Sequence, residues 1–552
     1  MLALLGLLAL SVGMAYGQAV DGNIVGTVVD TQGAVVVGAE VTATNVATND
    51  VAVTKTNNTG EYRFDHLLAG DYRITARATG FKTIGEMVAV ELNKTGTRNL
   101  TLTPGATSET VEVSGVPPTL DTTSAQIETT FSPKELGDMP SVSGGSGVIN
   151  LSLLDAGVAS SGGVGLGSGP SVSGQRPRNN NYTVEGVDNN SKAVTGPLLQ
   201  LPNDAVDQFT VLQNQFSPEF GHSSGGQFNQ TVKSGSNTLH GRLYEYFQNR
   251  NLNAQDSQVS LSQVSAGLTP QNTRYDNNRF GGQVGGPIIK NKLFFFTDWE
   301  YNPVGNATSS TGCAPTAAGY AELATIPLAN IAPAYNYSTN PPTPVSLGIN
   351  ATNLAQFQQY AGTALSQATS SDPNCSAFAY GFYTDATQTV NSVPTGDVGY
   401  SGANFYNNLT GITSLDWDIS QKDHLRGRYA YYKFDGIDFA GQLPAFWTTY
   451  PVRDHLFTLS EYHNFTPNVN NEVRIGFNRN FANYPDGGFS YPGLDAFPNL
   501  IVGFFEGNGV QLGADGNAPQ FGIQNFYQAV DNISWVKGNH NLKFGAEYRE
   551  YI

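Results

Sequence analysis

"NNEVRIGFNRNF", residues 470–481, carries apolar and polar side chains in alternation through its middle. The apolar set is Val473, Ile475 and Phe477, and the polar set is Glu472, Arg474 and Asn478. The same period of two recurs in "SLDWDIS" (414–420) and "HNLKFGAEYREY" (540–551). Because successive side chains of a β-strand point to opposite faces, each stretch predicts a strand with one apolar and one polar face.

The strands of a soluble all-β sandwich alternate in the same way as those of a membrane barrel. The connections between the strands therefore have to distinguish these two classes of all-β protein. Short turns are expected at residues 289–291, 420–423, 466–470 and 537–540, and long polar loops between the resulting hairpins, the largest at about 302–411. This layout is typical of an outer-membrane barrel. Aromatic residues suited to its interfacial girdles are Trp299, Tyr301, Tyr429 and Tyr431. We therefore expect residues 239–552 to form a partial antiparallel transmembrane β-barrel.

The composition excludes several classes of function. Charged residues make up 13% of the chain and the formal net charge is −17, so a nucleic-acid partner, which needs a basic surface, is not expected. Two cysteines among 552 residues provide neither a disulfide framework nor a thiolate metal cluster. The seven histidines are scattered, and neither an H-E-x-x-H pattern nor a catalytic Ser/His/Asp arrangement stands out. We expect no catalytic site, no metal site and no cofactor.

Residues 1–18 read "MLALLGLLALSVGMAYGQ". The apolar run Leu2–Val12 leads into Ala15-Tyr16-Gly17, a small-x-small cleavage pattern. The run is shorter than the roughly 20 apolar residues that span a bilayer, and no Lys or Arg precedes it. A buried core helix is the alternative, but nothing polar gives the run a second face. We expect residues 1–17 to be a signal peptide that exports the chain.

Residues 20–103 are rich in Val and Thr, and turn signals such as Asn58-Thr59-Gly60 separate short alternating stretches. This spacing predicts a small antiparallel β-sandwich. The inward positions of two strands are Tyr62, Phe64, Tyr72 and Ile74. The pattern G-x-V-x-D-x-x-G…V-x-G-A-x-V…G-x-Y-x-F…L-x-x-G-x-Y resembles the carboxypeptidase regulatory-like domain, which has a carbohydrate-binding-like fold. The resemblance implies a binding or spacer module without peptidase activity.

Residues 104–118 form a linker in which prolines bracket a short β-prone run, "ETVEVS". Its residues are Glu109, Thr110, Val111, Glu112, Val113 and Ser114. Two interpretations stay open. The run is either part of a linker or last strand of the sandwich, or it is an extended peptide that pairs with the sheet edge of a partner, where backbone hydrogen bonds supply the affinity.

Residues 119–238 hold "FSPKELGDMPSV" (131–142), which predicts a short helix from Ser132 to near Gly137, and the polar string "QRPRNNNYTVEGVDNNS" (175–191). Glycine-rich loops separate the short strands, and the apolar content is too low for a well-filled, free-standing core. Burying charged groups of this region in apolar surroundings would cost several kcal/mol. We therefore expect a unit enclosed by another part of the chain. Its candidate residues are Arg176, Glu185, Asp188 and Asn189.

Four strings, in this order, resemble the TonB-dependent outer-membrane transporters of the Oar-like branch, which carry an N-terminal carboxypeptidase regulatory-like domain. They are "GQRPRNNNYTVEGVDNN", "DAVDQFTVLQNQFSPEFGHSSGGQFNQTVKSGSNTLHGRLYEYFQN", "NRFGGQVGGPIIKNKLFFFTDWEY" and "KGNHNLKFGAEYR". The resemblance implies that residues 119–238 are a mixed plug domain inside the barrel. It also implies that Glu109–Ser114 is the coupling peptide and that the sandwich lies in the periplasm.

The resemblance further implies a mechanism and partners. A large nutrient, namely a glycan, a peptide or a chelate, binds at the outer side of a barrel embedded in outer-membrane lipid. A TonB-type inner-membrane energy-coupling complex then pulls on the plug through the coupling peptide. Two alternatives stay open: a surface receptor or adhesin that does not transport, and a carbohydrate-binding periplasmic protein in which the sandwich binds the ligand. The sequence carries no feature that identifies the ligand.

The two cysteines, Cys313 and Cys375, both fall in the longest predicted loop. The barrel layout puts this loop outside the cell, where thiols oxidise. A disulfide is therefore expected to close the loop.

About nine alternating strands follow His240, and the last runs to residue 552. Transporters of this kind close with roughly 22 strands. An open barrel would leave backbone groups unpaired in lipid, at several kcal/mol per group. The sequence is therefore expected to be the N-terminal part of a longer protein.

Overall fold

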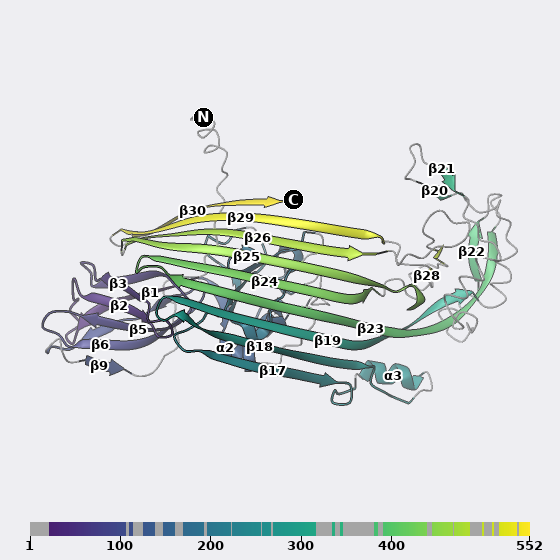
Figure 1. Cartoon of the computed structure of the whole chain (residues 1–552), viewed down its shortest axis with the longest axis horizontal. Helices are drawn as coiled ribbons and strands as arrows, with labels where there is room; N and C mark the ends of the chain where they lie inside the picture. Colours follow the sequence, from purple (N-terminus) through teal and green to yellow (C-terminus); the bar gives the residue numbers. More distant parts are fainter. Residues whose placement is uncertain are drawn as a thin grey trace.

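The protein was analysed as a computed structural model in which three bodies follow one another along the chain (Figure 1). A β-sandwich comes first, an inner domain second and a long barrel sheet third. The structure describes residues 21–105, 110–113, 125–138, 147–160, 169–192, 196–221, 223–255, 257–265, 269–315, 334–336, 343–345, 380–384, 390–438, 444–466, 468–485, 500–501, 511–512, 518–537 and 540–552. The expected signal peptide, residues 1–17, lies outside these ranges.

Two sheets form the sandwich. The first contains β1 (Gly22–Asp30), β4 (Glu61–Leu67), β7 (Thr95–Thr97) and β8 (Leu100–Leu102). The second contains, in spatial order, β3 (Val51–Lys55), β2 (Glu40–Asn45), β5 (Gly70–Arg77), β6 (Thr83–Val90) and β9 (Thr110–Val113). The four side chains predicted to point inward are all buried in the core between the sheets.

The sandwich departs from the expected antiparallel arrangement at three pairs of strands. β1 pairs in parallel with both β7 and β8, and β6 pairs in parallel with β9. The reason is a crossover, because parallel neighbours require the chain to return before it pairs again. After β6 the chain passes to the first sheet for β7 and β8, and it then comes back to the second sheet for β9.

The inner domain is a mixed sheet with short helices. Its elements are β10 (Ile127–Phe131), α2 (Pro133–Asp138), η1 (Gly147–Leu154), β11 (Val158–Ala159), β12 (Ser171–Val172), η2 (Pro177–Asn179), β13 (Asn181–Val184), β14 (Val187–Asp188), η3 (Asn203–Ala205), β15 (Val206–Asn214) and β16 (Gln227–Val232). Helix α2 begins where the sequence predicts, at a capping box. The Ser132 backbone N–H and hydroxyl donate to Glu135 Oε2 at 2.7 and 2.8 Å.

The core of the inner domain is shared with the barrel sheet. Phe131 stacks on Phe209 with 5.7 Å between ring centroids, and Tyr182 stacks on Phe228 at 4.9 Å. The same apolar cluster continues into the barrel sheet through Phe296, Ile412, Ala430, Leu456 and Phe526. The sequence predicted too little apolar content for a well-filled, free-standing core, and in the structure side chains of the barrel sheet form part of this core, which is enclosed by another part of the chain.

The barrel sheet is antiparallel, and its main strands pair in sequence order. They are β17 (His240–Asn249), β18 (Tyr275–Ile289), β19 (Leu293–Pro315), β23 (Val390–Asp418), β24 (Asp423–Asp438), β25 (Thr448–Thr466), β26 (Val469–Tyr484), β29 (Gln520–Lys537) and β30 (His540–Tyr551). Smaller elements are α3 (Ser257–Ser265), β20 (Ala334–Asn336), β21 (Thr343–Val345), β22 (Tyr380–Thr384), η6 (Pro444–Phe446), β27 (Leu500–Ile501) and β28 (Gln511–Leu512). The predicted short turns all coincide with hairpin ends, and the sandwich lies at that end of the sheet (Figure 1).

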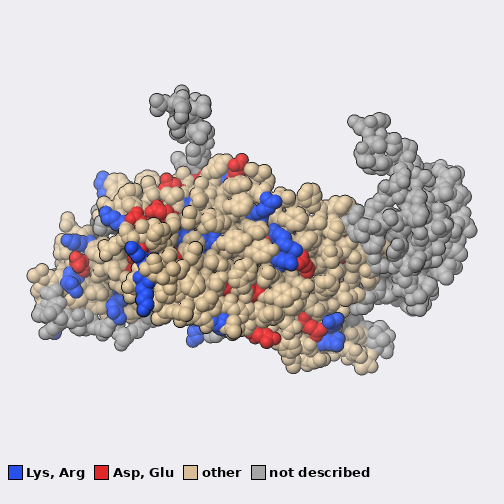
Figure 2. Space-filling view, in the orientation of Figure 1, with Lys and Arg blue, Asp and Glu red and all other residues tan. Residues whose placement is uncertain are grey.

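The two faces of the barrel sheet have the reverse of the polarity found in a soluble sandwich. On β26, Ile475 is 47% exposed on the outer face while its neighbour Arg474 is 0% exposed on the inner face. On β23, Leu415 and Trp417 are exposed while Asp416 is buried between them. Uncharged residues form most of the visible surface over the barrel strands in Figure 2. Apolar outside and polar inside is the arrangement of a membrane barrel.

Replacing Ile475 by arginine is therefore expected to destabilise the barrel by about 2–4 kcal/mol near the bilayer midplane, because a charge would face lipid. The measurement is the amount of protein that reaches the outer membrane after the change is made in the chromosomal gene. Ile475→Leu is the matched control and should leave that amount unchanged. A normal amount of the arginine variant would contradict a lipid-facing position.

Among the described residues, no helix has the length and apolar character needed to cross a membrane.

Candidate functional site

The run predicted as a coupling peptide lies on the sandwich. Residues 110–113 form β9, whose register with β6 pairs Thr83 with Thr110 and Gly85 with Glu112. β9 is the terminal strand of its sheet (Figure 1). Glu109 and Ser114 lie outside the described residues. The run is therefore the last strand of the sandwich, one of the two interpretations left open, and its coupling role stays a prediction.

The string that contains Glu185 and Asp188 forms a hairpin at the edge of the inner domain. Val184 of β13 pairs with Val187 of β14, and the two residues between them, Glu185 and Gly186, have φ values of 51° and 69°. Two consecutive residues with positive φ make the tight turn that suits the right-handed twist of a hairpin. The tip faces the barrel sheet, because a Cβ built on Gly476 of β26 would lie 2.6 Å from Val187 Cγ2.

Asp188 joins this hairpin to three strands of the barrel sheet. Its carboxylate Oδ2 accepts hydrogen bonds from Arg549 at 2.9 Å and from the Tyr551 hydroxyl at 3.0 Å. Its backbone N–H donates to Gln528 Oε1 at 3.0 Å, and its carbonyl accepts from Asn478 Nδ2 at 3.3 Å. The carboxylate is buried, so this ion pair lies in a region from which water is largely excluded. Asp188 is thus the centre of a polar contact between the inner domain and the barrel.

Glu185 makes a second contact between the inner domain and the barrel sheet. Its Oε1 accepts the backbone N–H of Val232 at 2.7 Å and lies 3.6 Å from Arg428 Nε on β24. Arg428 in turn donates to Asp416 Oδ1 at 2.7 Å and to Ser234 Oγ at 3.2 Å. The guanidinium is therefore shared between the barrel sheet and the inner domain.

The other two predicted residues do not touch the barrel sheet in the same way. Asn189 is buried within the inner domain, where its Nδ2 donates to the Leu199 carbonyl at 2.8 Å and its Oδ1 accepts the Leu199 N–H at 3.0 Å. Arg176 is exposed and precedes η2. Of the four predicted residues, two hold the inner domain against the barrel, one shapes a loop and one faces solvent.

Sequence reasoning did not single out the barrel partners of Asp188 and Glu185. The period of two put Asn478 and Arg549 on the polar faces of their strands, and that face is the signal that could have found them. The choice among many such polar residues required the three-dimensional pairing. The partners missed are Asp416, Arg428, Asn478, Gln528, Arg549 and Tyr551.

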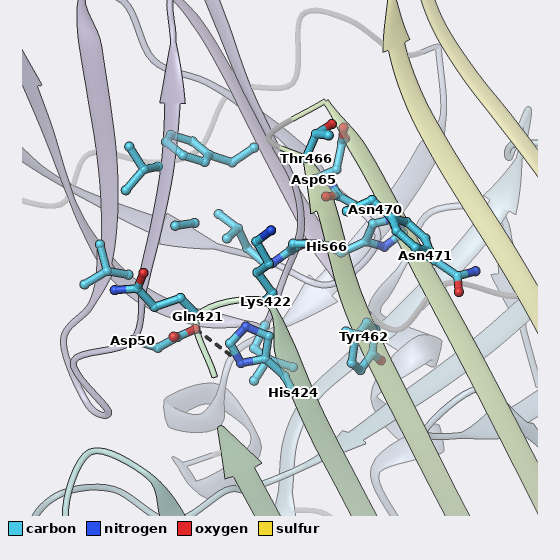
Figure 3. Close-up of a pocket in the computed structure, with 18 of the residues that line it drawn as sticks. Asp50, Asp65, His66, Gln421, Lys422, His424, Tyr462, Thr466, Asn470 and Asn471 are labelled. Atoms are coloured by element: carbon cyan, nitrogen blue, oxygen red, sulfur yellow. Dashed lines mark ion pairs between the residues drawn. The ribbon is translucent and has the colours of Figure 1, made fainter. Parts of the chain in front are cut away.

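A cavity of about 410 Å³ lies between the sandwich and the turn end of the barrel sheet (Figure 3). His66 on β4 lines this cavity and joins the sandwich to the barrel sheet, since Nε2 is 2.9 Å from Ser534 Oγ of β29 and Nδ1 is 2.5 Å from Asp21 Oδ2. Burial lowers the pKa of His66, but the Asp21 carboxylate outweighs burial and raises that pKa to about 9. The charged side chain thus helps to hold the sandwich together and against the barrel.

The stability of the sandwich is expected to fall as pH rises from about 6.5 to 9. The pKa of His66 is raised in the folded state, so its contribution is complete below the unfolded value near 6.5 and is lost as pH passes about 9. Glu472, Asp65 and Lys543 also act on this pair. The shift corresponds to at most about 3 kcal/mol. The measurement is the free energy of opening of β4 across this range. It is obtained from hydrogen exchange after correction for the intrinsic exchange rate at each pH. His66→Gln should flatten the profile and His240→Gln should not; a pH-independent wild type would contradict the assignment.

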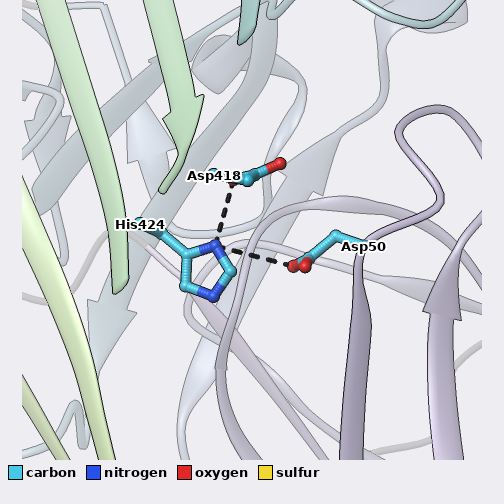
Figure 4. Close-up of side chains that lie close together, drawn as sticks. All are labelled: Asp50, Asp418 and His424. Atoms are coloured by element: carbon cyan, nitrogen blue, oxygen red, sulfur yellow. Dashed lines mark hydrogen bonds and ion pairs between the residues drawn. The ribbon is translucent and has the colours of Figure 1, made fainter. Parts of the chain in front are cut away.

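Three potential metal-ligand side chains meet at the edge of the same cavity (Figure 4). His424 Nδ1 lies 3.0 Å from Asp418 Oδ1 and 3.8 Å from Asp50 Oδ2 of the sandwich. Arg426 also donates to Asp418 Oδ1, at 2.6 Å. A guanidinium so close to the carboxylate opposes a second cation there. The group is better explained as an ion-pair contact between the sandwich and the barrel than as a metal site.

Cys313 lies in β19, where its backbone is paired with Asp397, so its predicted position in the long loop was wrong, and Cys375 lies outside the described residues. Their disulfide stays a prediction. Unreduced, denatured protein is expected to show no thiol that reacts with an alkylating reagent, because the bond would be formed outside the cell. Two alkylated cysteines, measured by mass spectrometry, would contradict it.

Two family descriptions match the chain. Residues 231–552 match the outer membrane beta barrel domain, and residues 23–103 match the carboxypeptidase regulatory-like domain. The chain is 30% identical over 293 residues to the TonB-dependent transporter Oar of Myxococcus xanthus. That alignment covers 51% of this chain and 27% of Oar, so the chain spans about a quarter of its relative.

Solved structures of outer-membrane proteins are also similar. The outer membrane transporter YddB of Escherichia coli has a TM-score of 0.46 at 11% identity, covering 76% of this chain and 48% of its own. The siderophore receptor PirA of Acinetobacter baumannii has a TM-score of 0.43 at 13% identity, covering 77% and 48%. The chain spans about half the length of these two proteins.

Proposed function

Because the chain belongs to the outer-membrane β-barrel family, we propose that it forms part of a TonB-dependent receptor that imports a large nutrient. In this proposal the inner domain, residues 119–238, is the plug, and the sandwich lies in the periplasm. Residues 1–17 are the signal peptide, and a TonB-type inner-membrane complex supplies the energy. The relatives are named as transporters and receptors, and we assign no enzymatic activity.

The polar contact around Asp188 carries this proposal. The inner domain packs on the barrel sheet through the apolar cluster that includes Phe296 and Phe526, and its hairpin adds a polar attachment. Here the hairpin is attached by an ion pair and by hydrogen bonds from three strands. Net hydrogen-bond energies are modest because water can replace each bond. A contact of this kind can open and reform when the lumen hydrates, as a movable plug requires.

The nutrient is proposed only as a class: a glycan, a peptide or a metal chelate. Trp299 and similar exposed aromatic residues face outward, toward lipid, so they carry no information about the ligand. The described residues offer no feature that selects among these ligands.

Growth of a deletion strain on single nutrients tests the function. Loss of growth on one large nutrient, restored by the intact gene, is the expected result. Unchanged growth on every nutrient, with loss of binding to cells or surfaces, would instead identify a receptor or adhesin that does not transport.

A further inference from the structure

Two polar contacts join the sandwich to the barrel sheet around the cavity between them. His66 Nε2 lies 2.9 Å from Ser534 Oγ, and His424 Nδ1 lies 3.8 Å from Asp50 Oδ2. The cavity volume of about 410 Å³ falls within the range of about 300–1,000 Å³ that is typical of pockets for small molecules. The contacts thus hold the two bodies together around a space large enough for a ligand.

The two walls of this cavity differ in polarity. The sandwich contributes apolar side chains, among them Val51 and Val53 of β3. Val53 is 46% exposed, so packing within the sandwich leaves it largely uncovered. The turn ends of the barrel sheet contribute mainly polar side chains (Figure 3), namely Gln421, Lys422, Tyr462, Asn464 and Asn470. A ligand in the cavity therefore meets apolar surface on one side and hydrogen-bonding groups on the other.

Several polar groups of the barrel wall are not used by the protein itself. The Tyr462 hydroxyl and the Asn470 amide have no hydrogen-bond partner among the described residues, although the two residues are only 6% and 8% exposed. The Lys422 ammonium also has no partner among them, and it points toward the middle of the lining side chains in Figure 3. Buried polar groups nearly always have a partner. The partner of these groups is therefore a molecule in the cavity.

Lys422 is the basic residue of the lining that lacks a counter-ion within the part of the chain that the structure describes. The other basic side chains each have a carboxylate partner, and they are Arg63, His66, His424 and Arg426. The carboxylates of the lining, Asp50 and Asp65, both take part in such pairs. A negative charge on a ligand therefore belongs beside Lys422, where a charge-assisted hydrogen bond is about twice as strong as a neutral one.

We propose that this cavity binds a small N-acyl amino acid through its free carboxylate. The carboxylate pairs with Lys422, and the side-chain amides of Asn464 and Asn470 bind the amide group of the ligand, since each amide both donates and accepts. The apolar side chain of the ligand lies against Val51 and Val53.

This inference goes beyond the proposed function, because it assigns a second ligand that is not the imported nutrient. The ligand contacts both bodies, so it binds the arrangement in which the sandwich is docked on the barrel sheet. Anything that binds one arrangement and not the other stabilises the first by mass action. The bound ligand therefore fastens the sandwich to the barrel.

The probe is N-acetyl-L-leucine, and its matched control is N-acetyl-L-leucinamide, which has the same shape without the charge. Binding is measured by titration calorimetry on the intact protein purified from outer membranes in detergent. We expect the acid to bind about tenfold more tightly than the amide, the usual effect of a hydrogen bond to a charged group. Saturation with the acid should slow hydrogen exchange in both β3 and the turn at residues 420–423.

A substitution then locates the charge. Lys422→Met keeps the length of the side chain and removes the ammonium, so it should weaken binding of the acid by about tenfold. Lys290→Met is the matched control, because Lys290 lies in another hairpin turn and does not line the cavity. It should leave binding unchanged. The comparison of the two probes needs no variant and stands even where a substitution lowers the yield of folded protein.

Four results would overturn the inference. Equal binding of the acid and the amide would show that no carboxylate is recognised. Displacement of the probe by an equal concentration of inorganic phosphate would show a general anion site. Binding that does not slow exchange in β3 would put the probe elsewhere, and absence of binding would mean that the cavity holds only water. None of these results bears on the proposed function, which the growth experiment decides.

Discussion

Replacing Val111 by proline is expected to abolish energy-coupled uptake while ligand capture at the outer surface continues. Val111 is an interior residue of the four-residue β9, which pairs with β6 from Thr83 to Glu86. Proline removes a backbone N–H and fixes φ, so a strand this short cannot keep its ladder or accept a partner strand. The measurement compares uptake with surface binding of the nutrient found in the growth experiment, after substitution in the chromosomal gene.

The control for this variant is Val111→Thr, which keeps both the N–H and a β-branched side chain. It should support nearly normal uptake. Proteolysis of both variants checks that the sandwich remains folded. Uptake by the proline variant at the wild-type rate would show that residues 109–114 are not the coupling segment.

Replacing Asp188 by alanine is expected to loosen the inner domain by about 3 kcal/mol, the cost of breaking a buried ion pair by removing one partner. The lower end of the usual range applies because Arg549 keeps Glu547, at 2.5 Å, as a second partner. The change also leaves the Tyr551 hydroxyl and the Asn190 N–H without their acceptor. The expected phenotype is greater sensitivity to large hydrophilic antibiotics, together with faster hydrogen exchange in β13 and β14.

Asp188→Asn is the informative comparison, because it keeps the shape and one acceptor oxygen but removes the charge. An intermediate sensitivity is expected for it. If alanine at this position changes neither antibiotic entry nor exchange in the hairpin, Asp188 does not hold the inner domain in the barrel.

The sequence was sufficient for the parts of the fold that depend on neighbouring residues. The period of two located the barrel strands and both of their faces, and the start at Ser132 and the stop near Gly137 located α2. The sequence could not predict the pairing between distant segments. Asp188 and Arg549 lie 361 residues apart, and nothing local distinguishes Arg549 from the other cations on polar strand faces.

β9 shows the same limit at shorter range. Its composition fits a linker, a sandwich strand or a free peptide equally well, and only the return of the chain from β8 puts it beside β6. Parallel neighbours are separated by a crossover, so their pairing leaves no local turn signal of the kind that marks a hairpin.

The reversed polarity of the barrel sheet has a consequence for tolerance to substitution. In a water-soluble protein, exposed positions accept most polar replacements and buried positions reject them. On β26 the rule should be inverted: Val473 and Ile475 face outward and should accept only apolar residues, whereas buried Glu472 and Arg474 should reject them. A saturation scan of this strand would then show that solvent-accessible area, the usual guide to permissive sites, misleads here. The outward residues would reject polar replacements although they are accessible, and the inward residues would reject apolar ones although they are buried.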